Sequence, residues 1–314
     1  MTILVLGCKG LVGSAICRKL LADGREFIGV SRADVDLMNL EATQSLFKKI
    51  KPNSVIGAAA KVGGMVANKT YPVEFLIDNL TLQNNMLRAA FDNEVEKFVF
   101  LGSSCIYPAL APQPISEESL LTGVLEKTNE AYAIAKIAGV KLVQSFRNEY
   151  KKNWISVMPT NLYGPGDNFD LKNSHVLAAF IRKFYDAKIA NSKKIELWGT
   201  GKPRREFMHV DDFASALLHI HDNYNSGEPI NIGTGKDISI YELAYMVAEI
   251  SEYKFEIHWD HSIPDGTFQK LLDIKKLKLV GWEPSISLEV GLQNTYKWFE
   301  KNYQNTRLNV SMNS

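Results

Sequence analysis

Short, wholly apolar runs alternate with longer helical patterns through the first half of the 314-residue chain. Strands are predicted at residues 3–6, 27–30, 55–60, 98–102 and 155–159, separated by helices at 11–22, 42–50, 72–93 and 130–150. Parallel strands buried on both faces need continuous apolar runs, and right-handed strand–helix–strand connections place helices on both sides of the sheet. The alternation therefore predicts an α/β fold with a doubly wound, Rossmann-type parallel sheet.

The pattern changes after about residue 165. Helices are predicted at 176–187, 211–221, 241–251 and 288–303, and strands at 195–198, 229–232 and 255–259. We expect a nucleotide-binding domain at 1–165, to which roughly residues 205–235 return. A smaller C-terminal α/β substrate domain is expected at 166–204 and 236–314.

The composition argues against several classes of protein. The formal net charge is +1, which gives no electrostatic reason to expect a nucleic-acid or membrane partner. Cys8, Cys17 and Cys105 show neither metal-ligand spacing nor a disulfide framework, so no metal is expected. No apolar run approaches the roughly 18 residues of a membrane span, and the N-terminal run is too short for a signal peptide, so we expect a cytoplasmic protein.

Three glycines, Gly7, Gly10 and Gly13, follow the first predicted strand and open the first predicted helix. Glycines at such a place let the backbone turn tightly and approach a pyrophosphate, which the free N–H groups of the helix N-terminus stabilise. Their spacing is not that of the commonest fingerprint, and a structural turn is the alternative interpretation. The position at the first strand–helix junction favours a dinucleotide site, which also includes Leu11 and Val12.

The end of the second predicted strand indicates which dinucleotide binds. NAD sites usually carry an acidic residue there, whereas here Arg32 follows the strand and Lys9 lies inside the glycine loop. Two cations favour the 2′-phosphate of NADP, unless Arg32 is only a solvated loop charge. Asp36 and Leu37 are expected adenine contacts, although Asp36 suits a turn equally well.

A reaction centre is indicated by Tyr132 and Lys136, which lie four residues apart on one face of a predicted helix. A nearby cation helps a tyrosine phenol to exchange a proton with a carbonyl or an alcohol near neutral pH. The spacing alone arises easily by chance. It gains meaning from the glycine loop and from Ser103, which follows a predicted strand and can hydrogen-bond the same carbonyl oxygen.

Together these motifs resemble the extended short-chain dehydrogenases/reductases, and within them the GDP-L-fucose synthase family. The resemblance runs from residue 3 to about residue 300. It rests on AAAKVGG at 58–64, GSSCIYP at 102–108, YAIAKIAG at 132–139, MPTNLYGP at 158–165, NSHV at 173–176 and REFMHVDD at 205–212.

The resemblance implies that NADPH and GDP-4-keto-6-deoxy-D-mannose are converted to GDP-L-fucose by epimerisation at carbons 3 and 5 and reduction at carbon 4. It implies that Cys105 removes the acidic protons beside the ketone and that His175 protonates the opposite face. Ser103 and Tyr132 would hold the ketone, and Lys136 would tune Tyr132. Without the resemblance, Cys105 reads as a small buried hydrophobic residue and His175 as a hydrogen-bonding residue at a helix start.

The same resemblance extends the expected sites. Further cofactor contacts are Ala58, Ala59, Ala60, Pro159, Asn161, Leu162 and His175. Further substrate contacts are Ser104, Asn161, Val176, Arg182, Trp198, Arg205 and Lys270. The alternative interpretation is ordinary surface charge for the three cations and core packing for Trp198. A homodimer is expected through the long helices that begin at Pro72 and Glu130.

Some positions depart from the family pattern. Cys8 and Lys9 stand where His-Arg or His-Lys is usual, and Ala131 and the Leu177-Ala178 pair stand where proline is common. These leave room for a related substrate such as a GDP-4-keto-heptose, or for reduction without epimerisation. A 4,6-dehydratase would carry carboxylates soon after Ser103, and none occurs there until Glu117. A protein that only binds NADP would commonly have lost the Tyr/Lys pair.

Overall fold

A six-stranded, wholly parallel sheet forms the centre of the computed structural model, which describes residues 2–171, 173–263 and 265–306. The strand order is β2-β1-β3-β4-β5-β9. Their bounds are β1 Ile3–Leu6, β2 Phe27–Val30, β3 Ser54–Gly57, β4 Lys97–Leu101, β5 Asn153–Pro159 and β9 Ile230–Ile232. The chain steps outward from β1 to β2 and then reverses to β3, so the predicted doubly wound sheet is confirmed. Ligands of such sheets bind beyond the carboxyl ends of the strands, at this reversal.

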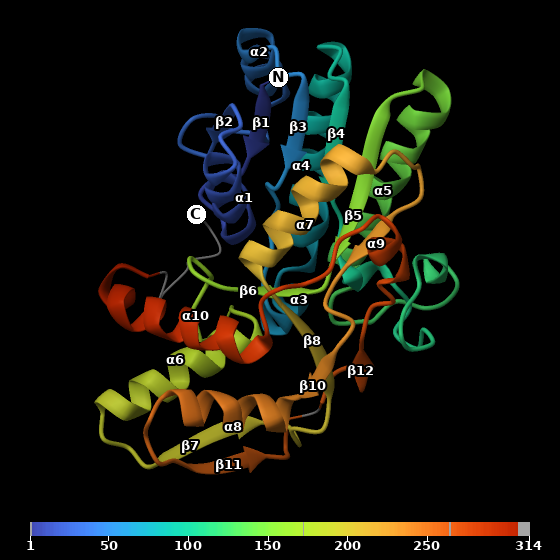
Figure 1. The fold of residues 1–314 in the computed structure, drawn as a ribbon. Coiled ribbons are helices and arrows are strands. Elements are labelled where there is room, and N and C mark those ends of the chain that lie inside the picture. Colours follow the sequence, from blue (N-terminus) through green and yellow to red (C-terminus); the bar gives the residue numbers. More distant parts are fainter. Residues whose placement is uncertain (1, 172, 264, 307–314) are drawn as a thin grey trace.

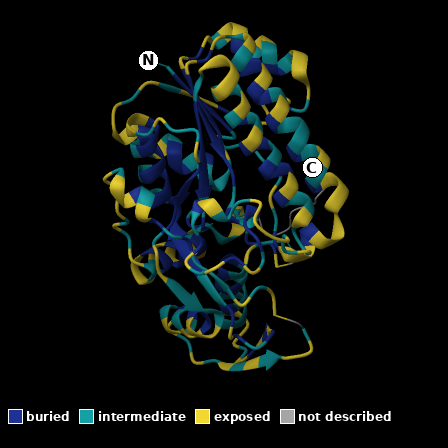
Figure 2. Cartoon of the chain, turned by 90° about the vertical axis from the view of Figure 1, so that its right-hand side faces the viewer, coloured by how far each residue is buried: buried dark blue, intermediate teal, exposed yellow. Residues whose placement is uncertain are grey.

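Helices cover both faces of the sheet (Figure 1). One face carries α1 (Leu11–Ala22) and α7 (Val210–Asn223), which pack against each other. The other carries α4 (Pro72–Asp92) and α5 (Glu130–Tyr150), with α2 (Leu40–Ile50) beside α4. Figure 2 shows that burial is concentrated in the strands, while the outer faces of the helices are exposed.

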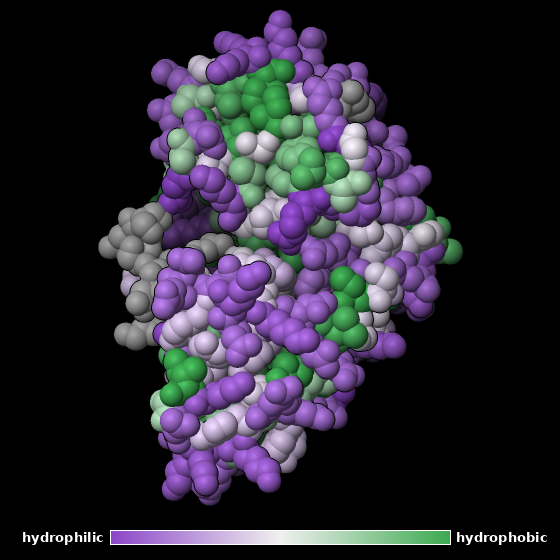
Figure 3. All heavy atoms as spheres, turned by 60° about the vertical axis from the view of Figure 1, so that its left-hand side comes forward, coloured by the Kyte–Doolittle hydropathy of each residue, from purple (hydrophilic) through white to green (hydrophobic). Residues whose placement is uncertain are grey.

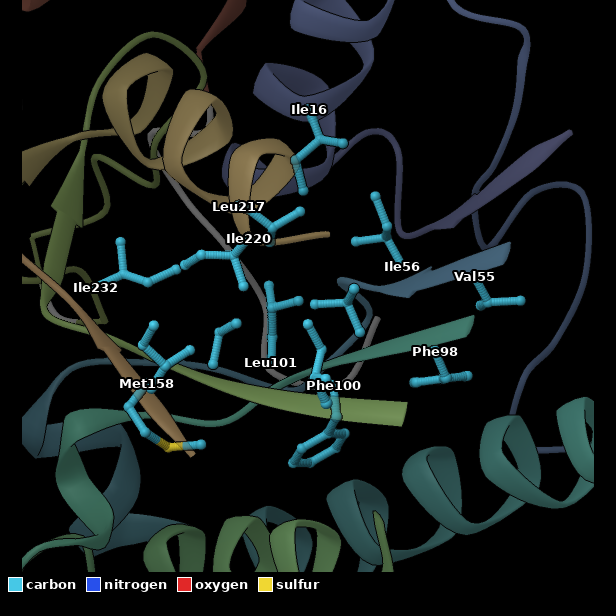
Figure 4. Close-up of a cluster of buried hydrophobic side chains, with 14 of the residues drawn as sticks. Ile16, Val55, Ile56, Phe98, Phe100, Leu101, Met158, Leu217, Ile220 and Ile232 are labelled. Carbon is cyan, nitrogen blue, oxygen red and sulfur yellow. The ribbon is translucent and has the colours of Figure 1, made fainter. Parts of the chain in front are cut away.

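The core between these layers is built from apolar side chains that alternate between the two faces of the sheet. Ile16 of α1 and Leu217 of α7 point toward Ile56 of the sheet (Figure 4). Phe100 points to the opposite side (Figure 4), where Gly139 of α5 leaves room for its ring: a Cβ there would lie 2.2 Å from the ring. One glycine in α5 therefore lets this helix approach the sheet closely.

Residues 272–282 depart from the predicted domain division. The sequence prediction assigns 236–314 entirely to the second domain, but Leu272, Leu277 and Trp282 belong to the first core. Here α9 (Lys275–Leu279) lies beside β9, and the backbone N–H of Asp273 donates to the carbonyl of Ile115 at 2.8 Å. This segment is a second return of the chain to the large sheet, after the one that supplies α7 and β9.

A second core lies below the first in Figure 1, among α6 (Val176–Ile189), α8 (Ile240–Ile250) and α10 (Leu288–Asn302). Strands β7 (Lys194–Trp198) and β11 (Glu256–Asp260) pair beside it in parallel. Between the two cores runs a small sheet of β6 (Asn161–Tyr163), β8 (Arg204–His209), β10 (Asp237–Ser239) and β12 (Gln269–Lys270). The sequence prediction missed this sheet and α3 (Met65–Thr70), because the elements are short and most carry polar side chains.

No helix in the part of the chain described is both long and apolar enough to cross a bilayer. The described residues also contain no cluster of three His, Cys, Asp or Glu side chains placed to hold a metal. Hydrophilic side chains cover most of the face in Figure 3, with hydrophobic ones gathered toward its upper part.

A buried hydrogen-bonded chain ties the amino end of β3 to the end of α7. Ser54 Oγ lies 2.6 Å from His221 Nε2, and His221 Nδ1 lies 2.6 Å from Asp222 Oδ1. Arg25 completes it with two hydrogen bonds to Asp222, at 2.8 and 3.0 Å. Burial lowers the pKa of His221, an effect that Asp222 only partly offsets.

We expect acid to weaken the fold through His221. The unfolded histidine, with a pKa of about 6.5, binds a proton more readily than the folded one, so stability is complete above that pH and falls below it. The free energy of unfolding, measured with urea between about pH 7.5 and about pH 5.5, should fall more steeply in the wild type than in His221→Gln. The exposed His258→Gln is the control and should keep the wild-type slope. Equal slopes for His221→Gln and wild type would contradict the assignment.

Candidate active site

The expected site residues converge at the carboxyl edge of the large sheet. Gly7 follows β1, Ala58 follows β3, Ser103 follows β4 and Asn161 comes just after β5. Because neighbouring parallel strands end at the same edge, residues far apart in the sequence become neighbours there. This edge includes the point between β1 and β3 at which the strand order reverses.

The glycine loop has the tight geometry that a dinucleotide site requires. Gly7 has φ +89°, and a Cβ there would lie 2.9 Å from the backbone nitrogen of Ala59. A Cβ on Gly13 would lie 2.1 Å from the carbonyl oxygen of Gly7. Gly10 is the N-cap of α1 and has no side chain to bond the first N–H groups of the helix. The loop therefore presents a helix N-terminus to a ligand such as a pyrophosphate.

The groups around the end of β2 fit an additional phosphate. Lys9 and Arg32 are both exposed. Asp34, the first acidic residue after β2, is turned back onto Ser31: it accepts from the backbone N–H at 2.8 Å and from Oγ at 2.6 Å. These hydrogen bonds lower the pKa of Asp34. Asp36 accepts from the backbone N–H of Met38 at 2.9 Å, which is the turn role left open by the sequence.

Tyr132 lies between Ser103, to which it is hydrogen-bonded, and Lys136, which lies beside its ring. Burial and then the neighbouring Cys105 raise the pKa of Tyr132, and a hydrogen bond with Ser103 offsets part of that rise. Lys136 Nζ lies 5.8 Å from the centre of the Tyr132 ring and donates to the carbonyl of Leu101 at 2.9 Å. Burial lowers the pKa of Lys136 to about 8. The phenol therefore keeps its proton at neutral pH and can donate it.

Cys105 lies in the 3₁₀ turn Ser104–Ile106 that follows β4, with its backbone N–H bonded to Ser103 Oγ at 3.2 Å. Two nitrogen donors meet its half-buried sulfur: Asn129 Nδ2 and Lys270 Nζ, each at 3.5 Å. Burial raises the pKa of Cys8 and raises that of Cys17 to about 11. At Cys105, a lysine ammonium lies within hydrogen-bonding distance of the sulfur.

His175 is the N-cap residue of α6, but its side chain makes no capping hydrogen bond. Just before it, the carbonyl of Asn173 accepts from the backbone N–H of Gly64 at 2.9 Å, and a Cβ on Gly64 would lie 2.4 Å from the carbonyl oxygen of Ser174. The loop after β3 thus fixes the backbone that carries His175. Loss of hydration and then the charge of Lys270 lower the pKa of His175.

Arg205 and Lys270 lie side by side on paired strands β8 and β12. Next to Arg205, the buried carboxylate of Glu206 accepts from the backbone N–H groups of Thr234 at 2.6 Å, Gly235 at 2.7 Å and Leu272 at 3.0 Å. Burial raises the pKa of Glu206. Sequence reasoning missed this residue, whose signal was an acidic side chain inside an otherwise cationic strand.

Arg182, a predicted substrate contact, interacts with its own helix and with the C-terminal segment. Its guanidinium pairs with Asp186 at 2.5 Å and lies 5.8 Å from the ring of Tyr303. The next residue, Lys183, instead lies 5.1 Å over the ring of Trp198, which is half exposed. Adjacent helical residues point about 100° apart, so one of two neighbouring cations reaches the tryptophan.

The remaining predicted contacts occupy mixed positions. Asn161 Nδ2 donates to the carbonyl of Glu206 at 2.8 Å, which ties β6 to β8. Ser104 is buried, and Leu37 packs in the first core. Ala58, Ala59 and Leu162 pack at the surface of the first core and Val176 at that of the second, while Ala60 and Pro159 are partly buried.

Comparison with known proteins agrees with this arrangement. Residues 3–233 match the NAD dependent epimerase/dehydratase family. GDP-L-fucose synthase 1 of Arabidopsis thaliana is 50% identical over 304 residues, which cover 96% of this chain and 94% of that protein. The chain belongs to this family, in its GDP-L-fucose synthase branch.

Solved structures of the family superpose closely. A GDP-L-fucose synthetase from Naegleria fowleri bound to NADP is 32% identical and has a TM-score of 0.91, covering 98% of this chain and 94% of that one. A GDP-6-OMe-4-keto-L-xylo-heptose reductase from C. jejuni is 33% identical with a TM-score of 0.90, covering 96% of this chain and 98% of that one. Fold similarity alone therefore does not separate these two activities, whereas the 50% identity to the Arabidopsis GDP-L-fucose synthase favours the first.

Proposed function

We propose that this chain is an NADPH-dependent oxidoreductase with epimerase activity. It converts GDP-4-keto-6-deoxy-D-mannose to GDP-L-fucose by inverting carbons 3 and 5 and reducing carbon 4. The observation that carries the proposal is the meeting of two donors at the sulfur of Cys105, beside the Ser103–Tyr132–Lys136 set. The 50% identity to a GDP-L-fucose synthase over nearly the whole chain supports it.

The cofactor is NADP(H), and the residues at the glycine loop fit it. Gly7, Gly10 and Gly13 admit a pyrophosphate at the start of α1, and the exposed cations Lys9 and Arg32 suit the 2′-phosphate. Asp34 is hydrogen-bonded to Ser31, so its carboxylate is already engaged and is not expected to bind the ribose 2′-hydroxyl as an acidic residue does in NAD sites. When bound, the nicotinamide supplies the hydride for carbon 4.

Ser103 and Tyr132 hold the ketone oxygen in this scheme. Both are hydroxyl donors, and the raised pKa of Tyr132 keeps its proton available for the alkoxide that forms at carbon 4. Lys136 lies beside the phenol and stabilises the phenolate that remains after the proton has left. The same two hydroxyls stabilise the oxygen of an enolate, so reduction and epimerisation share one binding arrangement.

Inversion needs a base and an acid on opposite faces of the sugar ring. Cys105 as thiolate takes a proton from carbon 3 or 5, an S–H bond forms, and the electron pair of the broken C–H bond moves to the ketone oxygen. His175 then delivers a proton to the other face. Its pKa is lowered partly by Lys270, so a diphosphate that neutralises this lysine favours the protonated imidazole.

The GDP moiety is assigned to the cations across the site. In this scheme Arg205 and Lys270 bind its diphosphate. Lys183 and the exposed ring of Trp198 form a second group of contacts for the same moiety. The loop 265–266 joins the two groups: Asp265 accepts from Thr200 just after Trp198, while Gly266 lies against the guanidinium of Arg205. Lys183 replaces Arg182 in this proposal.

Labelling in deuterated water tests the function. With NADPH and GDP-4-keto-6-deoxy-mannose, proton NMR should show deuterium at carbons 3 and 5 of GDP-L-fucose as NADPH is consumed. Cys105→Ser should lose at least about a hundredfold in the exchange rate, because the base is gone. Cys17→Ala, which removes a thiol from α1, is the control and should exchange normally. NADPH consumption with an unlabelled D-sugar product would instead indicate a plain 4-reductase and make GDP-4-keto-heptoses the next substrates to test.

The division of labour between Lys183 and Arg182 gives a second test. Lys183→Gln should raise KM for the GDP-sugar about tenfold, the effect of losing one ionic contact worth about 1.4 kcal/mol. Arg182→Gln should leave KM unchanged and lower the melting temperature, because it breaks the pair with Asp186. Steady-state kinetics and thermal unfolding of both variants check this. The reverse pattern would return the phosphate contact to Arg182.

A homodimer through α4 and α5 belongs to the same proposal, and the cytoplasmic location stays a prediction. Apolar side chains are exposed along one continuous set of helices: Met65 45% and Val66 41% on α3, Val73 62% and Ile77 54% on α4, and Ile134 44% on α5. Val73 and Ile77 lie one helical turn apart, on one face of α4.

Charges on that face should dissociate the dimer. Sedimentation of the double variant Val73→Lys, Ile77→Lys should give a monomer, because two desolvated ammonium groups oppose association. Leu21→Lys, at a residue 74% exposed on α1, is the control and should sediment as the wild type does. A monomeric wild type, or a dimeric double variant, would refute the interface.

A further inference from the structure

Asn129 occupies the N-cap position of α5 but does not cap the helix. Asparagine is favoured there because its side-chain oxygen accepts from an N–H of the first turn. In this protein no such hydrogen bond forms. The Nδ2 group donates instead to Cys105 Sγ at 3.5 Å, and Oδ1 is buried with no hydrogen-bond partner in the part of the chain described. The side chain of Asn129 therefore bonds the sulfur instead of the helix N-terminus.

The two donors at the sulfur favour its ionised form. A neutral thiol carries a hydrogen of its own that needs an acceptor, whereas a thiolate is an acceptor alone. Around Cys105 Sγ stand an amide N–H from Asn129 and an ammonium from Lys270. Hydrogen bonds to a charged group are about twice as strong as neutral ones, so both contacts gain when the proton leaves.

We propose that Asn129 is a positioning residue that holds the Cys105 sulfur as a thiolate, aimed at the carbon-bound proton of the substrate. The proposal rests on the proposed function, in which this thiolate forms the S–H bond as the C–H bond breaks and the electron pair moves to the ketone oxygen. In the part of the chain that is described, the side-chain hydrogen bond of Asn129 goes to the Cys105 sulfur, so its effect on the reaction passes through Cys105.

Other charged groups face the same sulfur from neighbouring elements. Lys270 of β12 contacts it, and Arg205 of β8 and Tyr132 of α5 both feel its charge. Glu126 lines the small pocket beside Cys105, and its carboxylate is held by the backbone N–H and the hydroxyl of Thr128. Asn129 differs from Lys270, Tyr132 and Glu126 because its amide has no ionisable proton. Its hydrogen bond to the sulfur is therefore available at every pH at which the protein is folded.

Two substitutions separate this role from helix capping. Asp and Ser are as good as Asn at an N-cap, so Asn129→Asp and Asn129→Ser should keep α5 intact. The first replaces the amide donor with a negative charge of the same shape, and the second removes the donor by shortening the side chain. Asn148→Asp, at an exposed position of the same helix, is the matched control for charge.

The primary readout is alkylation of Cys105 by iodoacetamide over a range of pH, followed by mass spectrometry of the peptide that contains it. Near neutral pH the rate should fall about tenfold in Asn129→Asp and by a smaller factor in Asn129→Ser, and the rising limb of the profile should move to higher pH. Asn148→Asp should alkylate as the wild type does. Wild-type profiles for both Asn129 variants would overturn the proposal.

Deuterium exchange at carbons 3 and 5 is the second readout. It should fall with the alkylation rate in both variants and recover partly at higher pH, which a merely structural defect would not do. Alkylation needs no substrate, so the two failures are distinguishable. If the wild type does not exchange deuterium, the proposed function fails while alkylation still tests Asn129. Normal exchange in Asn129→Asp would overturn the role of Asn129 and leave the function standing.

Discussion

A buried carboxylate, that of Glu206, fixes the geometry on which the site depends. It gathers backbone N–H groups from the segment after β9 and from the segment after β12, and its own strand carries Arg205. A buried charge is tolerated only when hydrogen bonds satisfy it, and here the bonds come from backbone that must lie in place to supply them. Arg205 and Lys270 owe their side-by-side placement to this arrangement. The two cations expected to bind a diphosphate, Arg205 and Lys270, are therefore positioned by the hydrogen bonds of the adjacent buried carboxylate of Glu206.

Much of the fold was predictable because its signals are local. The strands of the large sheet are continuous apolar runs, and the helices between them carry the matching periodicity, so their order and type follow from the sequence. The small sheet between the cores escaped prediction for the opposite reason. Strand β8 carries Arg204, Arg205 and Glu206 in succession, and β12 has two residues, so neither shows an apolar pattern. Such strands form because partners elsewhere in the chain are already placed.

The candidate site divides in the same way. Gly7, Tyr132 and Cys105 were identified from motifs with fixed spacing, and the structure brings their surroundings together. The roles proposed for Lys183 and Asn129 were not predicted, because they depend on side-chain direction. One of two adjacent cations reaches Trp198, and one N-cap side chain points away from its helix to a sulfur. Spacing along the chain reports which face of a helix a residue occupies, but not what stands opposite. Those partners come from other segments of the chain: Trp198 follows Lys183 after the end of α6, and Cys105 is 24 residues from Asn129.

The hydrogen-bonded chain of Ser54, His221 and Asp222 lies at the amino end of β3, whereas the chemistry is assigned to the carboxyl ends of the strands. The same strands thus serve two purposes at opposite ends, separated by the apolar core. We therefore expect substitutions at the amino end of β3 to act on the stability of the fold. Substitutions at the carboxyl ends of the strands should act on the proposed chemistry and on stability together, because Glu206 and Asn161 there also hold backbone in place. A search for a more stable variant can start at the amino edge, away from the proposed site.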